Sequence, residues 1–278
     1  MSTTPLHQLL ALKQVVAKQA AEVAQQVNTV NRSTPPFIDI DIGTAGIPMQ
    51  SKVHLVTFDP FDLPITKHNY ERHAFAISPL REGNATFYVN HARAGCSSLL
   101  PINPAFSAAA EAQEGVNKTY LADCLPENGC HLAPECNACK TCSTLKHHTD
   151  HFFHVAVLQC RRPPHGFDER VIPTMRLSSF LRSRGVQRVG FLKVDAQGAD
   201  LSIIEDVFTR TDVPIDHLRV ECQMLDRAPP MYVHGGFLPN DCFAAIEMVR
   251  RHRPALAKRI EWGGSNCHIA EYNLDFWM

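Results

Sequence analysis

The chain has 278 residues, of which 45% are hydrophobic and 20% charged, so it can bury a sizeable core and is not an intrinsically disordered protein. A net charge of −1 removes the electrostatic reason to expect nucleic acid or an anionic membrane surface as a partner. The sequence contains no apolar run long enough to span a membrane and no basic segment before an apolar core near its start. We expect a globular cytoplasmic protein, with a lumenal or secreted location as the alternative.

Residues 6–30 carry apolar side chains at helical spacing on a background rich in alanine, glutamine and lysine. The apolar positions are Leu9, Leu12, Val16, Ala20, Val23, Val27 and Val30. This pattern predicts an amphipathic helix as a separate N-terminal element, residues 1–34. We expect the helix to lie on its own domain. The alternative is a short coiled coil, through which the chain would form a homodimer.

Segments of alternating or continuous apolar residues follow the double proline Pro35-Pro36 and predict strands. They cover residues 37–42, 53–58, 74–77, 85–89, 189–194 and 218–221, and a hairpin covers 259–262 and 267–272. Helices are predicted at 201–208 and 241–252. Strands that alternate with helices predict an α/β fold with a mostly parallel sheet and helices on both of its faces. The C-terminal hairpin would add an antiparallel strand.

Acidic residues lie at the ends of three of the predicted strands, namely Asp41, Asp59 and Asp195. In a parallel sheet, ligands bind at the carboxyl ends of the strands. Gly43 and Gly46 follow the first strand and would let a ligand approach the backbone, while Asp59 suits the hydroxyls of a ribose. Glycines near an aspartate are also common in ordinary turns, so a turn and a nucleoside site both stay open. The motif GxGxxG is missing, which opposes a nicotinamide-dependent oxidoreductase.

Residues 189–207 carry a motif that is more specific than these glycines and acids. They contain the run Lys-x-Asp-x-Gln-Gly-x-Asp, formed by Lys193, Asp195, Gln197, Gly198 and Asp200, and this run resembles the signature of FkbM-type S-adenosylmethionine-dependent methyltransferases. Weaker matches to the family, in the family's order, lie at 37–45, 58–60, 76–78, 82–88, 95–99 and 220–221. The resemblance implies a class I methyltransferase fold, which is Rossmann-like, for residues 35–278.

The resemblance implies S-adenosylmethionine as the cofactor and methyl transfer to a hydroxyl of a sugar, glycan or other small molecule. The residues that it assigns to the cofactor are Asp41, Gly43, Thr44, Asp59, Ile77 and Ser78. Within this set, Asp59 would hold the ribose hydroxyls, and Ile77 and Ser78 would lie near the adenine.

Asp195 is the residue that we expect to orient the acceptor or to act as the general base. The alternative is that it caps the following helix or braces the loop. Lys193 is expected to pair with a carboxylate. The connection between the first two strands, residues 44–53, is short for a parallel crossover. A non-catalytic binding module that keeps the fold is therefore the second hypothesis.

Residues 121–165 depart from the family pattern and concentrate cysteine and histidine. Cys136, Cys139 and Cys142 are spaced so that two thiolates can chelate one ion, and with Cys130 they would form a tetrahedral zinc site. Disulfides, an iron–sulfur cluster and free thiols are the alternatives. Four other cysteines are scattered singly and are expected to be ordinary small buried residues. They are Cys96, Cys222, Cys242 and Cys267.

Overall fold

A computed structural model describes residues 37–43, 49–61, 64–91, 94–106, 167–225, 230–266 and 271–278. The predicted N-terminal helix and the cysteine- and histidine-rich segment lie outside these residues. Within them, no helix is long and apolar enough to cross a membrane.

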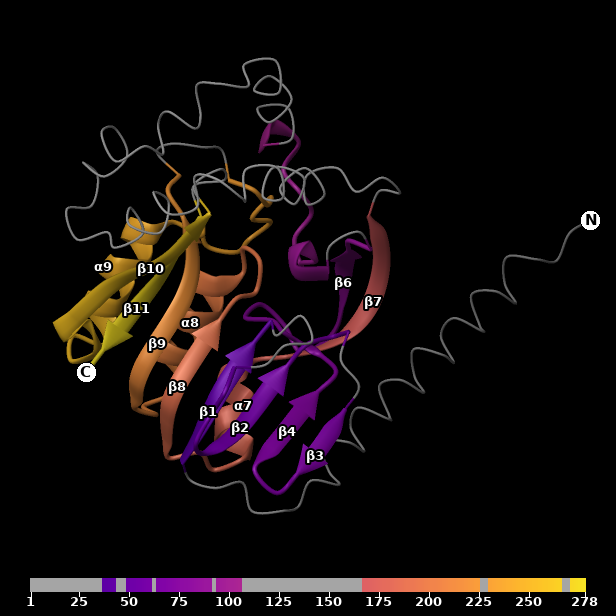
Figure 1. The fold of residues 1–278 in the computed structure, drawn as a ribbon. Helices are drawn as coiled ribbons and strands as arrows, with labels where there is room; N and C mark the ends of the chain where they lie inside the picture. The colour runs from indigo at the N-terminus through magenta and orange to yellow at the C-terminus, as the bar shows by residue number, and fades with distance from the viewer. Residues whose placement is uncertain are drawn as a thin grey trace, which may run out of the picture.

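An eight-stranded sheet forms the centre of the molecule (Figure 1). In order across the sheet its strands are β10 (Arg259–Asn266), β11 (Glu271–Trp277), β9 (Ile215–Gln223), β8 (Arg188–Val194), β1 (Phe37–Ile42), β2 (His54–Phe58), β4 (Tyr70–His73) and β3 (Ile65–Lys67). The five strands from β9 to β4 pair in parallel, and β11 runs antiparallel between β9 and β10. The mostly parallel sheet and the C-terminal hairpin are therefore confirmed.

A smaller sheet of three strands lies beside the first. Its order is β5 (Ala76–Ile77), β7 (Asp168–Met175) and β6 (Gly83–Val89). β7 is parallel to β5 and antiparallel to β6. The short 3-10 helix η1 (Ala94–Cys96) follows β6, and a second one, η3 (Leu256–Lys258), precedes β10.

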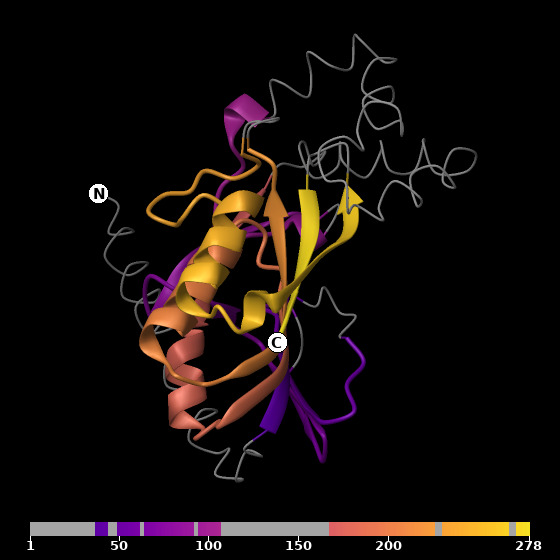
Figure 2. The ribbon, with the colours of Figure 1, turned by 90° about the vertical axis from the view of Figure 1, so that its left-hand side faces the viewer.

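Three α-helices cover one face of the large sheet, as Figure 2 shows. They are α7 (Leu177–Ser183), α8 (Asp200–Arg210) and α9 (Cys242–His252). Helices were predicted on both faces, but the described residues place none on the other face. The reason lies in the connections. Residues 43–53 are few for a helical crossover between β1 and β2, and the connection from β2 to β4 contains strand β3.

The alternating sequence of β1 separates two environments. Ile38, Ile40 and Ile42 are buried in the main core together with apolar residues of the helices. Asp39 and Asp41 point to the opposite face because successive side chains of a strand alternate. There they hold the short crossover, since Asp39 accepts a hydrogen bond from the Ser51 hydroxyl at 2.6 Å and Asp41 accepts one from the Met49 N–H at 2.7 Å.

Aromatic rings pack on one another on the face without described helices. The His217 ring stacks between Phe191 and Trp277, with centroid distances of 4.1 and 3.4 Å. Asp275 binds both His217 and Arg219. Burial acts to raise the pKa of Asp275, but the hydrogen bonds from His217 and Arg219 outweigh it, and the pKa is lowered.

The third parallel strand differs from the prediction. It is Tyr70–His73, whereas residues 76–77 of the predicted strand belong to the smaller sheet. Its central residue Glu71 is buried, and it pairs with His73 and with Arg184. A strand whose buried residue is charged lacks the apolar pattern on which strand prediction depends. The sequence patterns also did not predict strand β7 or helix α7.

Candidate functional site

A cavity of about 90 Å³ lies at the carboxyl ends of β1, β2 and β8. Its walls combine Gly43, Asp59 and the turn Asp195–Gln197 with apolar side chains. The apolar lining residues include Phe58, Phe61, Ile77, Phe87 and Leu99. The position is the one where parallel sheets bind ligands.

Gly43 fixes the distance between the ends of β1 and β8. It has φ +79°, and a Cβ at this position would lie 1.8 Å from the backbone oxygen of Asp195. Its N–H donates to the Phe58 oxygen at 3.0 Å, and the Asp195 N–H donates to the Ile42 oxygen at 3.2 Å. Only glycine permits this close approach, which brings Asp195 to the cavity wall.

Asp59 directly follows β2 and lines the cavity. It is 3% exposed, and its Oδ1 accepts the N–H of Phe61 at 2.9 Å, so the side chain is fixed in a local turn. Ile77 contributes to the wall from β5. Ser78 is buried, donates its N–H to the Met175 oxygen and is not among the residues that line the cavity.

Asp41 was predicted to lie beside the cofactor. It lies on the face of β1 opposite to Ile40 and Ile42 and does not line the cavity. It accepts a hydrogen bond from the Lys193 ammonium at 3.1 Å. Burial raises the pKa of the Asp41 carboxyl, against the lowering effect of Lys193. Asp41 therefore anchors the crossover and Lys193. Thr44, also predicted to lie at the cofactor, is outside the described residues.

Lys193 connects two carboxylates, which confirms that it pairs structurally. Its Nζ lies 3.1 Å from Asp41 Oδ1 and 3.3 Å from Asp195 Oδ2. Burial acts to lower the pKa of Lys193, but the charges of Asp195 and Asp41 outweigh it and raise the pKa. Lys193 therefore stays charged at neutral pH and holds one oxygen of Asp195.

Gln197 holds the other oxygen of Asp195. Its Nε2 lies 2.9 Å from Asp195 Oδ1 and 2.8 Å from Glu221 Oε2. Its Oε1 accepts the Tyr232 hydroxyl at 2.8 Å, and its backbone oxygen accepts the Ser98 hydroxyl at 2.6 Å. The sequence pattern singled out the acid and the glutamine of this motif, but it gave no sign that Tyr232 would reach Gln197 from a distant part of the chain.

Asp200 braces the turn before α8, which is the structural role considered for Asp195. The N-cap of α8 is Ala199, without a side-chain hydrogen bond, so Asp195 does not cap this helix. Asp200 accepts the N–H groups of Ala196 and Gly198 at 2.9 and 3.0 Å and the Asn240 amide at 3.1 Å. Burial raises the pKa of Asp200 to about 7, although the N–H groups of Ala196 and Gly198 act to lower it.

The raised pKa of Asp200 makes stability depend on pH. Between its ordinary pKa of 3.8 and about 7, the folded protein holds more protons than the unfolded chain. The free energy of unfolding therefore falls as pH rises through this window. We expect the melting temperature of the wild type to fall relative to that of Asp200→Asn over the same range. Thermal melts of both proteins would show this, since other groups cancel in the difference. Parallel pH curves would contradict it.

The predicted zinc ligands Cys130, Cys136, Cys139 and Cys142 lie outside the described residues. In the ranges that the structure does describe, no group of three or more His, Cys, Asp or Glu side chains could hold a metal ion.

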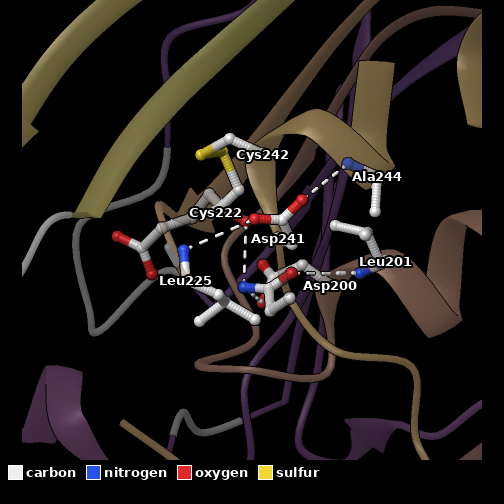
Figure 3. The surroundings of a disulfide bond; sticks show 9 residues. Asp200, Leu201, Cys222, Leu225, Asp241, Cys242 and Ala244 are labelled. Carbon is white, nitrogen blue, oxygen red and sulfur yellow. Dashed lines mark hydrogen bonds between the residues drawn. A yellow bond between two sulfur atoms is a disulfide. The ribbon is translucent and has the colours of Figure 1, made fainter. Parts of the chain in front are cut away.

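Three of the scattered cysteines are not the ordinary buried thiols that were predicted. Cys222 at the end of β9 and Cys242 at the start of α9 form a disulfide, with Cα atoms 5.0 Å apart (Figure 3). Cys96 is disulfide-bonded as well. Asp241, beside the bond, caps α9 through the Ala244 N–H. The two cysteines are 20 positions apart in the sequence, so only the topology of the sheet brings them together.

A model of the methyltransferase FkbM domain family matches residues 51–231. This range contains the second strand, the smaller sheet and the turn around Gln197. The comparison with curated proteins and the comparison with solved structures found no match.

Proposed function

Because the chain belongs to the family with a methyltransferase FkbM domain, we propose that it transfers a methyl group from S-adenosylmethionine to a hydroxyl of a sugar, glycan or other small molecule. The observation that carries the proposal is the cavity at the carboxyl ends of β1, β2 and β8, with one aspartate from each of two strand ends in its wall. The cofactor supplies an activated methyl group when it is bound.

The residues in the wall fit this cofactor. Asp59 offers carboxylate oxygens, which suit the two hydroxyls of a ribose. Gly43 has no side chain, so the backbone of β1 can approach a ligand. Ile77 and Phe87 provide apolar surface of the kind that packs on an adenine. We place the ribose at Asp59 and the adenine toward Ile77.

Asp195 is the residue that would receive the acceptor. Methyl transfer needs the acceptor oxygen aligned with the methyl group and relieved of its proton. Asp195 lines the cavity, and its two oxygens are held by Lys193 and Gln197. A carboxylate fixed in this way can accept a hydrogen bond from a hydroxyl and orient it, and it can take up the proton as transfer proceeds.

Methyl-labelled S-adenosylmethionine, incubated with a panel of monosaccharides, oligosaccharides and hydroxylated small molecules, tests the proposal. We expect labelled O-methyl product with the wild type. Asp195→Asn should reduce the rate about 100-fold or more because it removes a group that accepts the proton. If the folded wild type binds the cofactor but methylates none of these acceptors, the alternative of a non-catalytic binding module gains support.

Other proposals concern residues outside the described ranges. We retain a zinc site at Cys130, Cys136, Cys139 and Cys142 and a homodimer through the helix predicted at 6–30 as proposals from the sequence.

The disulfide between Cys222 and Cys242 weighs against the cytoplasmic location that we expected, since such bonds persist in oxidising compartments. It favours the lumenal or secreted alternative.

A further inference from the structure

Gln197 adopts a backbone conformation that side chains rarely take. Its φ is +52°, and among the described residues it is the one non-glycine residue with positive φ. Such conformations persist only where surrounding contacts hold them, and they concentrate at functional sites. Gln197 also lines the cavity.

The contacts of Gln197 determine which way its amide points. The Tyr232 hydroxyl lies 2.8 Å from Oε1, and the two carboxylates lie within 2.9 Å of Nε2. The reverse orientation would aim the amide oxygen at two carboxylates, which cannot donate when ionised. The amide NH₂ therefore faces Asp195 and Glu221, with one N–H for each.

This arrangement lets two acids of like charge lie side by side. Asp195 is at the end of β8 and Glu221 is near the end of β9, which pairs with β8. Two neighbouring carboxylates normally repel and turn apart, or one of them takes up a proton. The shared NH₂ group offsets part of this repulsion. Lys193 on the other oxygen of Asp195 adds a positive charge at 3.3 Å.

We infer that Gln197 is a positioning residue, whose side-chain amide holds Asp195 against Glu221 and aims it at the methyl-transfer end of the cavity. The inference rests on the proposed function. Asp59 and Asp195 are the ionisable residues among those that line the cavity. With the ribose at Asp59, the sulfur end of a bound cofactor would lie toward Asp195, the other ionisable residue of the wall.

The position of Asp195 determines which form of the cofactor the cavity prefers. The sulfonium of S-adenosylmethionine is positively charged, whereas S-adenosylhomocysteine has a neutral sulfur and is otherwise the same molecule without the methyl group. A fixed carboxylate at the sulfur end therefore favours the charged ligand. The ratio of the two dissociation constants reports the position of Asp195, because general damage to the cavity weakens both ligands and cancels in the ratio.

Calorimetric titration of the full chain with each ligand measures this ratio. We expect Asp195→Asn to reduce the preference for S-adenosylmethionine about fivefold, and Gln197→Ala about threefold, relative to the wild type. The double variant should lose no more than Asp195→Asn alone, because Gln197 acts through Asp195. Gln197→Gly is the second variant, since glycine adopts the positive φ without strain and keeps the fold. Asp212→Asn, an exposed acid in the connection between α8 and β9, is the control for charge and should leave the ratio unchanged.

A ratio that stays at the wild-type value in both folded Gln197 variants would overturn the inference. Additive losses in the double variant would also overturn it. Failure of the proposed function would look different, because the folded wild type would then bind neither ligand, or would bind both ligands and methylate no acceptor.

Discussion

Gly43→Ala is expected to abolish cofactor binding and to lower the free energy of unfolding by about 3 kcal/mol or more. The added Cβ would lie 1.8 Å from the Asp195 backbone oxygen, at φ +79°. Either β1 or the Asp195 turn must then move, and both form the cavity wall. Urea denaturation measures the stability, and calorimetric titration with S-adenosylmethionine measures the binding.

Gly185→Ala is the matched control. Gly185 also has positive φ, +62°, but a Cβ there would have no atom within 4 Å. This variant therefore suffers the backbone strain alone, which is about 1 kcal/mol, and should bind the cofactor like the wild type. Equal losses of stability in the two variants would show that the contact with Asp195 contributes nothing.

Removal of the disulfide between Cys222 and Cys242 is expected to lower the free energy of unfolding by about 3 kcal/mol. The bond closes a loop with a sequence separation of 20, and it fixes the start of α9 to the end of β9. For a chain of this size, the loss corresponds to a melting temperature lower by roughly 6–12 °C. Differential scanning calorimetry of Cys222→Ala, Cys242→Ala and the double variant measures it.

The comparison among these variants separates the bond from the side chains. Each single variant breaks the same disulfide, so the double variant should be little less stable than either one. Two unbonded buried thiols would instead give losses that add. Additive losses would therefore mean that the bond is absent in the protein.

The parallel sheet could be predicted because its central strands are apolar on the face that meets the helices. Ile38, Ile40 and Ile42 alternate with acids, and residues 189–194 are continuously apolar except for Lys193. Strand β4 could not be predicted in this way, because its buried residue is the charged Glu71. Only the folded chain brings Glu71 together with its partners His73 and Arg184. The disulfide between Cys222 and Cys242 could not be predicted either, because only the folded chain brings the two cysteines together.

The candidate site was predicted unevenly. Gly43, Asp59, Ile77 and Asp195 follow or form strand ends, and the structure brings them into one cavity wall. Asp41 is one residue before the end of its strand, so the alternation of side chains turns it to the other face. A rule that places every acid near a strand end at the ligand ignores this alternation.

The binding of S-adenosylmethionine to the wild type and to Asp59→Ala, measured by calorimetric titration, tests the central claim most directly. Asp59→Asn serves as the matched variant, because it keeps the shape and one oxygen but loses the second acceptor for the ribose hydroxyls. We predict micromolar binding to the wild type, weaker by about tenfold in Asp59→Asn and lost in Asp59→Ala. No binding to the folded wild type, or equal binding to all three proteins, would contradict the assignment of the cavity to this cofactor.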